Sequence, residues 1–186
     1  DGLLKGIYLY SPAKASRKKN AQILASGVGV NWALKAQKLL AEDFDVAASV
    51  WSVTSWNELR RDGLAVDRHN LLNPQDQRTA YITSKLDGAK GPVIAVSDFM
   101  RAVQDQIAPW VTQPFAALGT DGFGLSDTRG ALRRHFKVDA ESIVISALQQ
   151  LAAQGDIKPK LIQEAIDKYQ INDVRAADAG NTEGSG

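Results

Sequence analysis

Short apolar runs that alternate with amphipathic stretches restrict most strongly how this chain can fold. The runs at Ala21–Ser26, Val46–Val53, Pro92–Val96 and Phe115–Leu118 are four to eight residues long, and helical spacing lies between them. Such alternation predicts parallel strands whose two faces are covered by helices. A short β-rich run at Gly6–Tyr10 is expected at an edge. The sequence thus predicts an α/β fold: a mostly parallel, doubly wound sheet of about five strands, one antiparallel edge strand and helices on both faces.

Apolar spacing and capping residues predict where the helices begin. Ser55 and Glu58 form a capping box, and the helix that they begin is expected to falter at Gly63. Ser97 is expected to cap a long amphipathic helix whose apolar stripe, from Phe99 to Val111, belongs to the core or a subunit interface. Other helices are expected over Trp32–Phe44 with Asn31 as cap, over Thr79–Leu86, and from Asp127, Asp139 and Pro159 onward. The polar stretch from Ser11 to Asn20 is predicted to be a solvated hairpin connection.

The charge balance and the rare residue types exclude several functions. The 186 residues include 22 basic and 21 acidic side chains, a net charge of +1 that does not favour binding to nucleic acid or to a membrane surface. There is no cysteine, which excludes disulfides, zinc thiolate sites and a cysteine nucleophile, and two histidines are too few for a histidine-rich metal site. No apolar run approaches the roughly 18 residues of a membrane span. A cytoplasmic location is expected.

One domain with a short tail is the expected organisation. Residues 1–172 have the pattern of a single domain, whereas residues 173–186 end in the small, polar sequence AGNTEGSG and are expected to be a flexible tail or linker. The chain starts at Asp1 rather than at a methionine. We interpret it as a domain excised from a larger protein.

The chemistry-bearing side chains gather in the stretch Phe115–Asp139, where a strand, a glycine-rich loop and a helix follow one another. Such joints between strand and helix hold ligands or partner contacts in α/β proteins. We expect Gly122 to have a positive φ. The candidates for an interface or a domain joint are Asp121, Phe123, Ser126, Asp127, Arg129, Arg133 and His135. An anion site on the Gly119–Ser126 backbone is the alternative, although Asp121 and Asp127 put negative charge there.

Several catalytic and cofactor motifs are absent. Gly27 and Gly29 follow a strand, but Trp32 occupies the position of the third glycine in a dinucleotide-binding motif, so a tight turn is expected instead. Ser126 and His135 do not have the arrangement of a nucleophilic triad, and there is no phosphate-binding P-loop. His69 lies among polar residues and is expected to be structural or exposed.

The same stretch carries a family resemblance. The sequence GTDGFGLSDTR at residues 119–129, followed by Leu132-Arg133 and by FKVD at residues 136–139, resembles the C-terminal domain of the transketolase-like thiamine diphosphate enzymes. The resemblance is strongest to the homodimeric bacterial pyruvate dehydrogenase family. Transketolases and branched-chain relatives share the fold, but the sequence FGLSD favours pyruvate dehydrogenases. Supporting segments of the chain are residues 1–8, 24–29, 52–63, 68–74 and 96–100.

The resemblance implies a full-length enzyme that decarboxylates pyruvate with thiamine diphosphate and Mg²⁺ and then reductively acetylates a lipoyl group. The family binds both cofactors with other domains, through a Gly-Asp-Gly segment and an asparagine pair. Here Arg61 precedes Asp62-Gly63 and no asparagine pair occurs, so no catalytic, cofactor-binding or metal-binding residue is expected in this chain. By itself it is expected to be inactive.

The same resemblance implies contacts with a twin subunit, with the enzyme's own middle domain and with the dihydrolipoyl acetyltransferase component. These contacts would make the chain a structural and dimerisation domain. The alternative is a free-standing α/β module that binds an anion, or regulates, through the Gly119–Ser126 loop.

Overall fold

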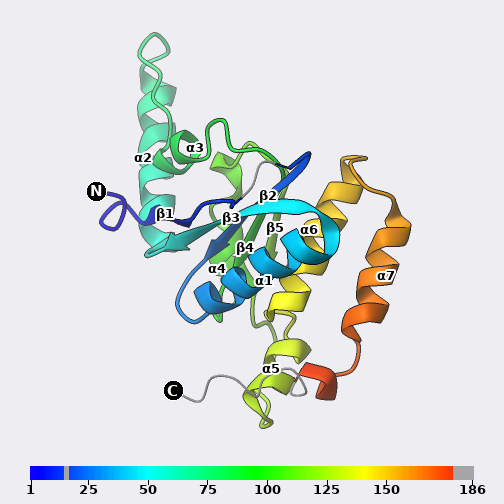
Figure 1. Cartoon of the computed structure of the whole chain (residues 1–186). Helices are drawn as coiled ribbons and strands as arrows, with labels where there is room; N and C mark the ends of the chain where they lie inside the picture. The colour runs from blue at the N-terminus through cyan, green and yellow to red at the C-terminus, as the bar shows by residue number, and fades with distance from the viewer. Residues whose placement is uncertain (15–16, 178–186) are drawn as a thin grey trace.

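A five-stranded sheet with the order β1-β3-β2-β4-β5 forms the centre of the molecule (Figure 1). We describe it from a computed structural model, which covers residues 1–14 and 17–177. Strand β1 (Ile7–Ser11) runs antiparallel to β3 (Val46–Val53). The other neighbouring strands are parallel. Strand β2 (Lys19–Ala25) pairs with β3 and with β4 (Val93–Val96), and β4 pairs with β5 (Phe115–Leu118). The predicted α/β sheet with one antiparallel edge strand is confirmed.

Helices cover both faces of the sheet. On one face, α1 (Gly29–Phe44) and α6 (Ala140–Ala153) pack on the strands, and α7 (Pro159–Tyr169) packs against α6 (Figure 1). The other face carries α2 (Trp56–Leu72), α3 (Tyr81–Lys85), α4 (Arg101–Asp105) and the 3₁₀ turn η1 (Ala108–Trp110). Alternate residues of β2 divide between the two cores, because successive strand side chains point to opposite faces.

Helix α2 continues through Gly63, so the prediction that it would falter there is wrong. A Cβ atom at Gly63 would lie 2.3 Å from Cδ2 of Trp110. The missing side chain therefore makes room for the indole ring, and the indole Nε1 donates to the carboxylate of Asp67 at 3.0 Å. The cost of a glycine within a helix is offset here by tertiary packing.

The long helix predicted after Ser97 is replaced by two short elements. Ser97 Oγ accepts from the Phe99 amide at 3.2 Å, and α4 begins only at Arg101. The chain then re-forms a turn at η1, where Pro109 lacks the amide that a continuous helix would need. Phe99 and Met100 are 54% and 58% exposed, so these two members of the predicted apolar stripe are not core residues.

Two other local predictions are wrong, and two are confirmed. Helix α1 begins at Gly29 and not after Asn31, and its N-cap residue Val28 makes no side-chain cap. The segment after β1 is not a hairpin connection, because β3 separates β1 from β2 in the sheet. The predicted starts of α6 and α7 are confirmed, since Asp139 accepts from the Ser142 amide at 3.0 Å and Pro159 opens α7.

Ordered structure reaches past the predicted domain boundary at residue 172. The 3₁₀ turn η2 (Arg175–Ala177) packs against α5 (Arg129–His135). The remainder of the predicted tail, residues 178–186, lies outside the described residues. The boundary itself stays a prediction.

Candidate functional site

The carboxyl ends of β2, β4 and β5 meet at one edge of the sheet. From β2 the chain passes through α1, on one face of the sheet, to β3 on one side of β2. From β3 it passes through α2 and α3, on the opposite face, to β4 on the other side of β2. The strand order therefore reverses between β2 and β4. Open α/β sheets bind ligands and partners at such points. Ser26 and Ser97 follow these two strands and their hydroxyls hydrogen-bond at 2.8 Å, while the indole of Trp56 donates to Ser26 Oγ at 3.0 Å.

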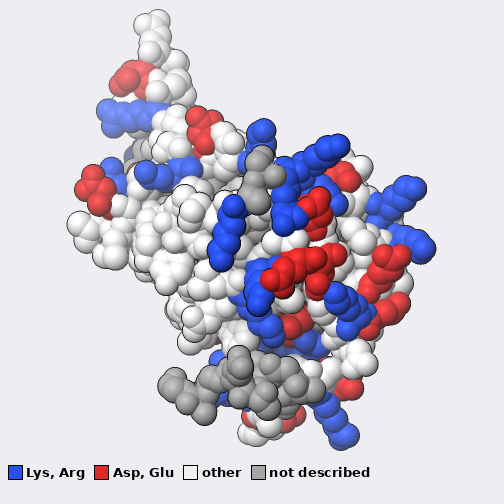
Figure 2. Space-filling view, in the orientation of Figure 1, with Lys and Arg blue, Asp and Glu red and all other residues white. Residues whose placement is uncertain are grey.

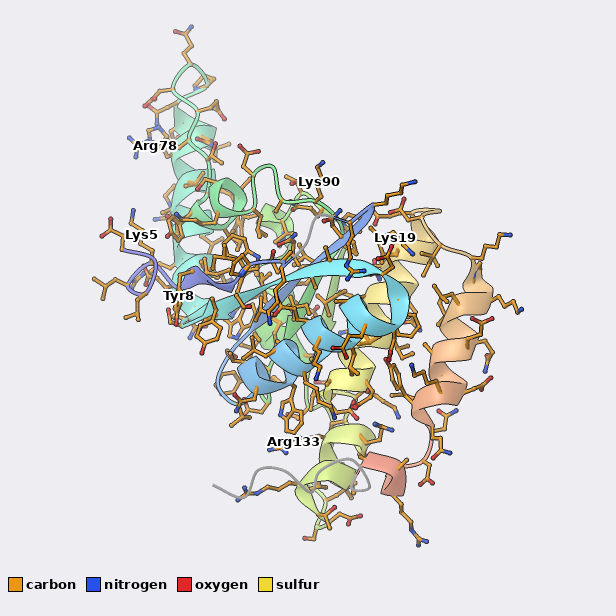
Figure 3. The ribbon with its side chains drawn as sticks, viewed as in Figure 1. Lys5, Tyr8, Lys19, Arg78, Lys90 and Arg133 are labelled. Atoms are coloured by element: carbon orange, nitrogen blue, oxygen red, sulfur yellow. The ribbon has the colours of Figure 1, made fainter. Side chains whose placement is uncertain are left out.

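A hollow of about 210 Å³ lies at this edge. Its lining is mainly apolar and comes from Val28, Gly29, Trp32, Val96, Ser97, Asp98, Thr120, Leu132, Arg133, Phe136 and Val138. The Arg133 guanidinium lies over the Trp32 ring, 4.4 Å from its centroid, and Figure 3 labels Arg133 just below α1. Burial, together with the neighbouring Arg129, lowers the pKa of Arg133, and Asp98 opposes this shift. The guanidinium nevertheless stays charged, because arginine does not lose its proton in proteins.

The glycine-rich loop after β5 is held by hydrogen bonds at its first residues, Thr120 and Asp121, and exposes Phe123 beyond them. The Thr120 amide donates to the Phe99 carbonyl at 2.9 Å, and the Thr120 hydroxyl donates to the Asp98 carbonyl at 2.6 Å. Asp121 accepts from the Arg101 amide at 3.0 Å. Beyond these bonds the side chain of Phe123 is 95% exposed. The base is therefore held in place, while the tip presents an aromatic ring to solvent.

The predicted site residues do not form one cluster. Asp127 accepts from the amide of its neighbour Thr128, and Thr128 itself caps α5 by accepting from the Ala131 amide, so the predicted cap at Asp127 is wrong by one residue. Ser126 and Arg129 are exposed. His135 is also exposed and contacts Phe136 edge to face at 4.9 Å. Of the predicted site residues, only Arg133 lines the hollow. Within residues 1–14 and 17–177, neither Arg129 nor Arg133 forms an ion pair with Asp121.

Sequence reasoning missed part of this edge. Val28, Phe99, Met100 and Leu125 are exposed apolar side chains here, in addition to Phe123. We call these five residues the carboxyl-edge surface. No local sequence signal could have revealed Phe99 and Met100, because the Phe99 carbonyl accepts from the amide of the distant Thr120 instead of from a helix of its own.

Metal-binding groups and membrane-spanning helices are not found in the described part of the chain. No three His, Cys, Asp or Glu side chains there lie together in a way that could hold a metal ion. His69 Nε2 is within 2.8 Å of the Asp76 carbonyl, so this histidine holds a loop together. No helix of the described residues is long and apolar enough to cross a membrane.

Gly122 has a φ of +93°, which confirms the positive value expected from the sequence. We predict that Gly122→Val destabilises the chain by about 1–2 kcal/mol, because left-handed backbone is costly for a β-branched residue. Gly124→Val is a matched control, since both glycines have open space where the side chain would be added and only Gly122 has a positive φ. Urea unfolding measures both variants, and equal stability of the two would contradict the prediction.

Comparisons with known proteins agree with this architecture. The family model described as "Transketolase-like TK C-terminal domain" matches residues 6–139. A split-gene transketolase described as an inactive beta4 tetramer superposes with a TM-score of 0.54 at 18% identity, over 78% of this chain and 42% of that chain. This likeness supports the fold alone.

Two other proteins are much more similar to this chain in sequence than the split-gene transketolase. The pyruvate dehydrogenase E1 component of Mycolicibacterium smegmatis is 56% identical over 178 residues, which cover 95% of this chain and 19% of that protein. The protein of the same name from Mycobacterium tuberculosis is 52% identical over 184 residues, or 98% of this chain and 20% of that protein. The chain thus spans about a fifth of the length of these relatives. It belongs to the family of transketolase-like C-terminal domains.

Proposed function

We propose that this chain is the C-terminal domain of a pyruvate dehydrogenase E1 component and that it contributes contacts rather than catalysis. The 56% identity over 178 residues with a protein of that name supports this assignment most strongly. In this proposal the full-length enzyme is a cytoplasmic homodimer that uses thiamine diphosphate and Mg²⁺. It decarboxylates pyruvate and reductively acetylates a lipoyl group of the dihydrolipoyl acetyltransferase component.

The residues present here do not fit the cofactors. The Asp-Gly pair that Sequence analysis compares with the thiamine signature, Asp62-Gly63, lies within α2. The Asp62 carboxylate accepts from the Tyr81 amide at 2.6 Å, and Gly63 packs against Trp110. Both residues have structural partners, so we assign cofactor binding to other domains of the enzyme and no reaction step to this chain.

The carboxyl-edge surface supports a contact role. Its five side chains are 48–95% exposed and belong to the segments that follow β2, β4 and β5. Exposed apolar groups in one region mark interaction sites more often than isolated ones do. We assign this surface to the joint with the enzyme's middle domain or twin subunit. The anion-binding alternative is less well supported, because Asp98 and Asp121 lie at the same edge and their carboxylates would repel an anion.

Calorimetry with thiamine diphosphate and Mg²⁺ tests the assignment of the cofactors. We expect no binding to the 186-residue chain and clear binding to the full-length enzyme, which should also decarboxylate pyruvate. Binding to the short chain would contradict the proposal. Protection of the Gly119–Ser126 amides by inorganic phosphate would favour the anion-binding alternative instead.

Substituting Phe123 tests the contact role. The ring is 95% exposed, so Phe123→Ser should change the free energy of unfolding of the 186-residue chain by less than about 0.5 kcal/mol. In the full-length enzyme the same change should weaken the contact by about 1.5–3 kcal/mol, the value of burying such a side chain. Thermal unfolding and the rate of pyruvate decarboxylation measure the effect.

Tyr10→Ser is the matched control for that experiment. Tyr10 is 51% exposed and lies on the edge strand β1, which β3 separates from β2, β4 and β5. The control should leave the full-length enzyme close to the parent. A Phe123 variant that also matches the parent in the full-length enzyme would show that Phe123 makes no contact there.

A further inference from the structure

A second hollow, of about 300 Å³, is formed by β5, α6 and the end of α7. Its apolar walls are Leu118 of β5, Ile145 of α6, Ile166 of α7 and Ile171. All four side chains belong to the core on that face of the sheet or pack against it. Among the described residues it shares no lining residue with the hollow at the carboxyl edge, so it is a separate feature, which we call the α6 hollow.

Two serine side chains of α6 line the α6 hollow and lack hydrogen-bond partners. Ser142 and Ser146 are 5% and 7% exposed and lie one helical turn apart. Within the described residues the buried Ser142 Oγ has no hydrogen-bond partner, and the Ser146 hydroxyl forms no hydrogen bond either. Most buried hydroxyls in proteins are paired, so two unpaired ones on the same face of a helix need an explanation. A ligand with acceptor oxygens would supply the missing partner.

Lys137 provides the positive charge of the α6 hollow. Its Nζ donates to the Ile171 carbonyl at 2.8 Å, which uses one of the three N–H groups of the ammonium. Burial lowers the pKa of Lys137, while Asp139 opposes this shift and Arg134 adds to it. The Asp139 carboxylate is itself paired with Arg134. An ammonium that has lost part of its hydration is stabilised by an added anion, so Lys137 favours an acidic ligand.

The backbone of Lys137 has a conformation in which glycine is favoured, because its φ is +59°. The Lys137 amide donates to the Arg134 carbonyl at 3.2 Å. The next amide, of Val138, donates to the Arg133 carbonyl at 3.0 Å. This pair of bonds is a helix-ending motif in which glycine is the commonest residue. Lysine at this place costs stability, and residues held in such strain gather at functional sites. The contacts of its side chain therefore explain the lysine better than the turn does.

The composition of the lining indicates which kind of ligand would fit. Among the described residues that line the α6 hollow, Lys137 is the one charged residue, and Gln149 adds an exposed amide. The outer side formed by α1 and α7 is different, because acidic and basic side chains are mixed there (Figure 2). A hollow with positive charge and apolar walls favours a ligand that combines a negative charge with an apolar body.

We propose that the α6 hollow binds a small carboxylate with an apolar tail. The carboxylate would accept from the Lys137 ammonium and from a serine hydroxyl of α6, and the tail would pack on Ile145 and Ile166. A volume of about 300 Å³ holds roughly ten non-hydrogen atoms, since a water molecule takes up about 30 Å³. A short fatty acid has this size. The site adds a ligand to the proposed contact role and does not depend on that role.

Hexanoate is a probe of the proposed size and charge. Titrated into the 186-residue chain, it should shift the amide NMR signals of residues 137–149 in a saturable way, with a Kd of about 1 mM, as expected for so small a ligand. Hexan-1-ol and hexylamine have the same tail without the negative charge. Both should bind at least about tenfold more weakly, because they lack the charged hydrogen bond to Lys137.

Lys137→Gln is the first variant, and Lys160→Gln is its matched control. Lys137→Gln should weaken hexanoate binding about tenfold, because the charged contact with the carboxylate is lost. The Lys160 side chain lies on α7, is 85% exposed and does not line the α6 hollow, so its variant should bind hexanoate like the parent. Ser146→Ala retains a good helix former and should weaken hexanoate binding about fivefold.

Lys137→Gly keeps the test falsifiable if Lys137→Gln folds poorly. Glycine suits the positive φ of residue 137, so this variant should fold and still bind hexanoate about tenfold more weakly than the parent. Equal hexanoate affinity of the parent and Lys137→Gly, or equal affinity of the parent for hexanoate and hexan-1-ol, would overturn the proposal. Shifts that are absent, or that spread over the whole chain without saturation, would also overturn it. Localised, saturable shifts that depend on Lys137 and Ser146 would support it.

Discussion

Arg134→Ala is expected to destabilise the 186-residue chain by about 3–5 kcal/mol, the cost of removing one partner from a buried ion pair. Arg134 is 2% exposed, and its guanidinium contacts two carboxylates and two carbonyls. Nε donates to Asp139, and Nη2 lies 3.3 Å from Glu141 Oε2. Nη1 donates to the carbonyls of Tyr169 and Gln170 at 3.0 and 3.3 Å. One side chain thereby connects α5, the start of α6 and the end of α7.

The loss would spread from Arg134 to its partners. Asp139 also caps α6 by accepting from the Ser142 amide, so an unpaired Asp139 carboxylate would remain buried at the helix start. The last carbonyls of α7 would lose their donor as well. Because a buried group without a partner costs its full desolvation energy, the expected effect is larger than that of an average substitution.

Urea unfolding with linear extrapolation measures this effect. Arg129→Ala is the matched control, because Arg129 is exposed on the same helix and should change the free energy of unfolding by less than about 0.5 kcal/mol. Arg134→Lys keeps the charge but not the planar set of donors, and an intermediate loss is expected. An alanine variant within about 1 kcal/mol of the parent would show that the four contacts contribute little to stability.

Arg133 and Arg134 also show how far the sequence predicts the site. Both arginines lie in the stretch Phe115–Asp139, in which Sequence analysis places the chemistry-bearing side chains, yet they have different environments. Arg133 lies over Trp32 at the hollow, while Arg134 is buried against α7. Neighbouring helical residues point in different directions, and the buried direction depends on a backbone 35 residues away. Local sequence patterns do not contain that information.

The sheet was more predictable than the helices that cover it. Strands β3 and β4 and the Ala21–Ala25 part of β2 are short, largely apolar runs that are buried almost throughout, so composition alone identifies them, whereas β5 is only partly buried. Helix boundaries depended on tertiary contacts instead. Trp110 allows α2 to continue through Gly63, and Thr120 uses the Phe99 carbonyl where a longer helix was expected. In both places a residue distant in sequence decides the local structure, which helical propensity cannot predict.

The positive φ of Gly122 was predictable, but the consequences of other glycines were not. The sequence Asp87-Gly-Ala-Lys-Gly91 indicates a turn, and both of its glycines have positive φ, +71° at Gly88 and +83° at Gly91. Their surroundings differ completely. A Cβ atom at Gly88 would have nothing within 4 Å, whereas one at Gly91 would lie 1.8 Å from the Asn20 carbonyl oxygen. Only the packing of the turn against β2 creates this difference.

Gly91→Ala is therefore expected to destabilise the chain by about 2–5 kcal/mol, the sum of a positive-φ cost and an overpacking cost. The atoms in the way belong to the backbone of Asn20 and Ala21, which cannot rotate aside as a side chain can. Moving them would disturb β2, because the Gln22 amide donates to the Pro92 carbonyl at 2.8 Å. The Gln22 side chain also donates to the Lys90 carbonyl at 2.9 Å. The clash is thus held in place by the bonds that join β2 to β4.

Gly88→Ala separates the two contributions to that loss. It has the same kind of backbone strain without the clash, so a loss of about 1–2 kcal/mol is expected. The difference between the variants, measured by urea unfolding on the same chain, isolates the contact with β2. If the two variants lose equal stability, the turn moves away from β2 at little cost, and Gly91 is needed only for its backbone angle. A markedly larger loss of stability for Gly91→Ala than for Gly88→Ala would show that the start of β4 can lie directly against β2 only with glycine at residue 91. Strands β2 and β4 are the pair between which the strand order reverses.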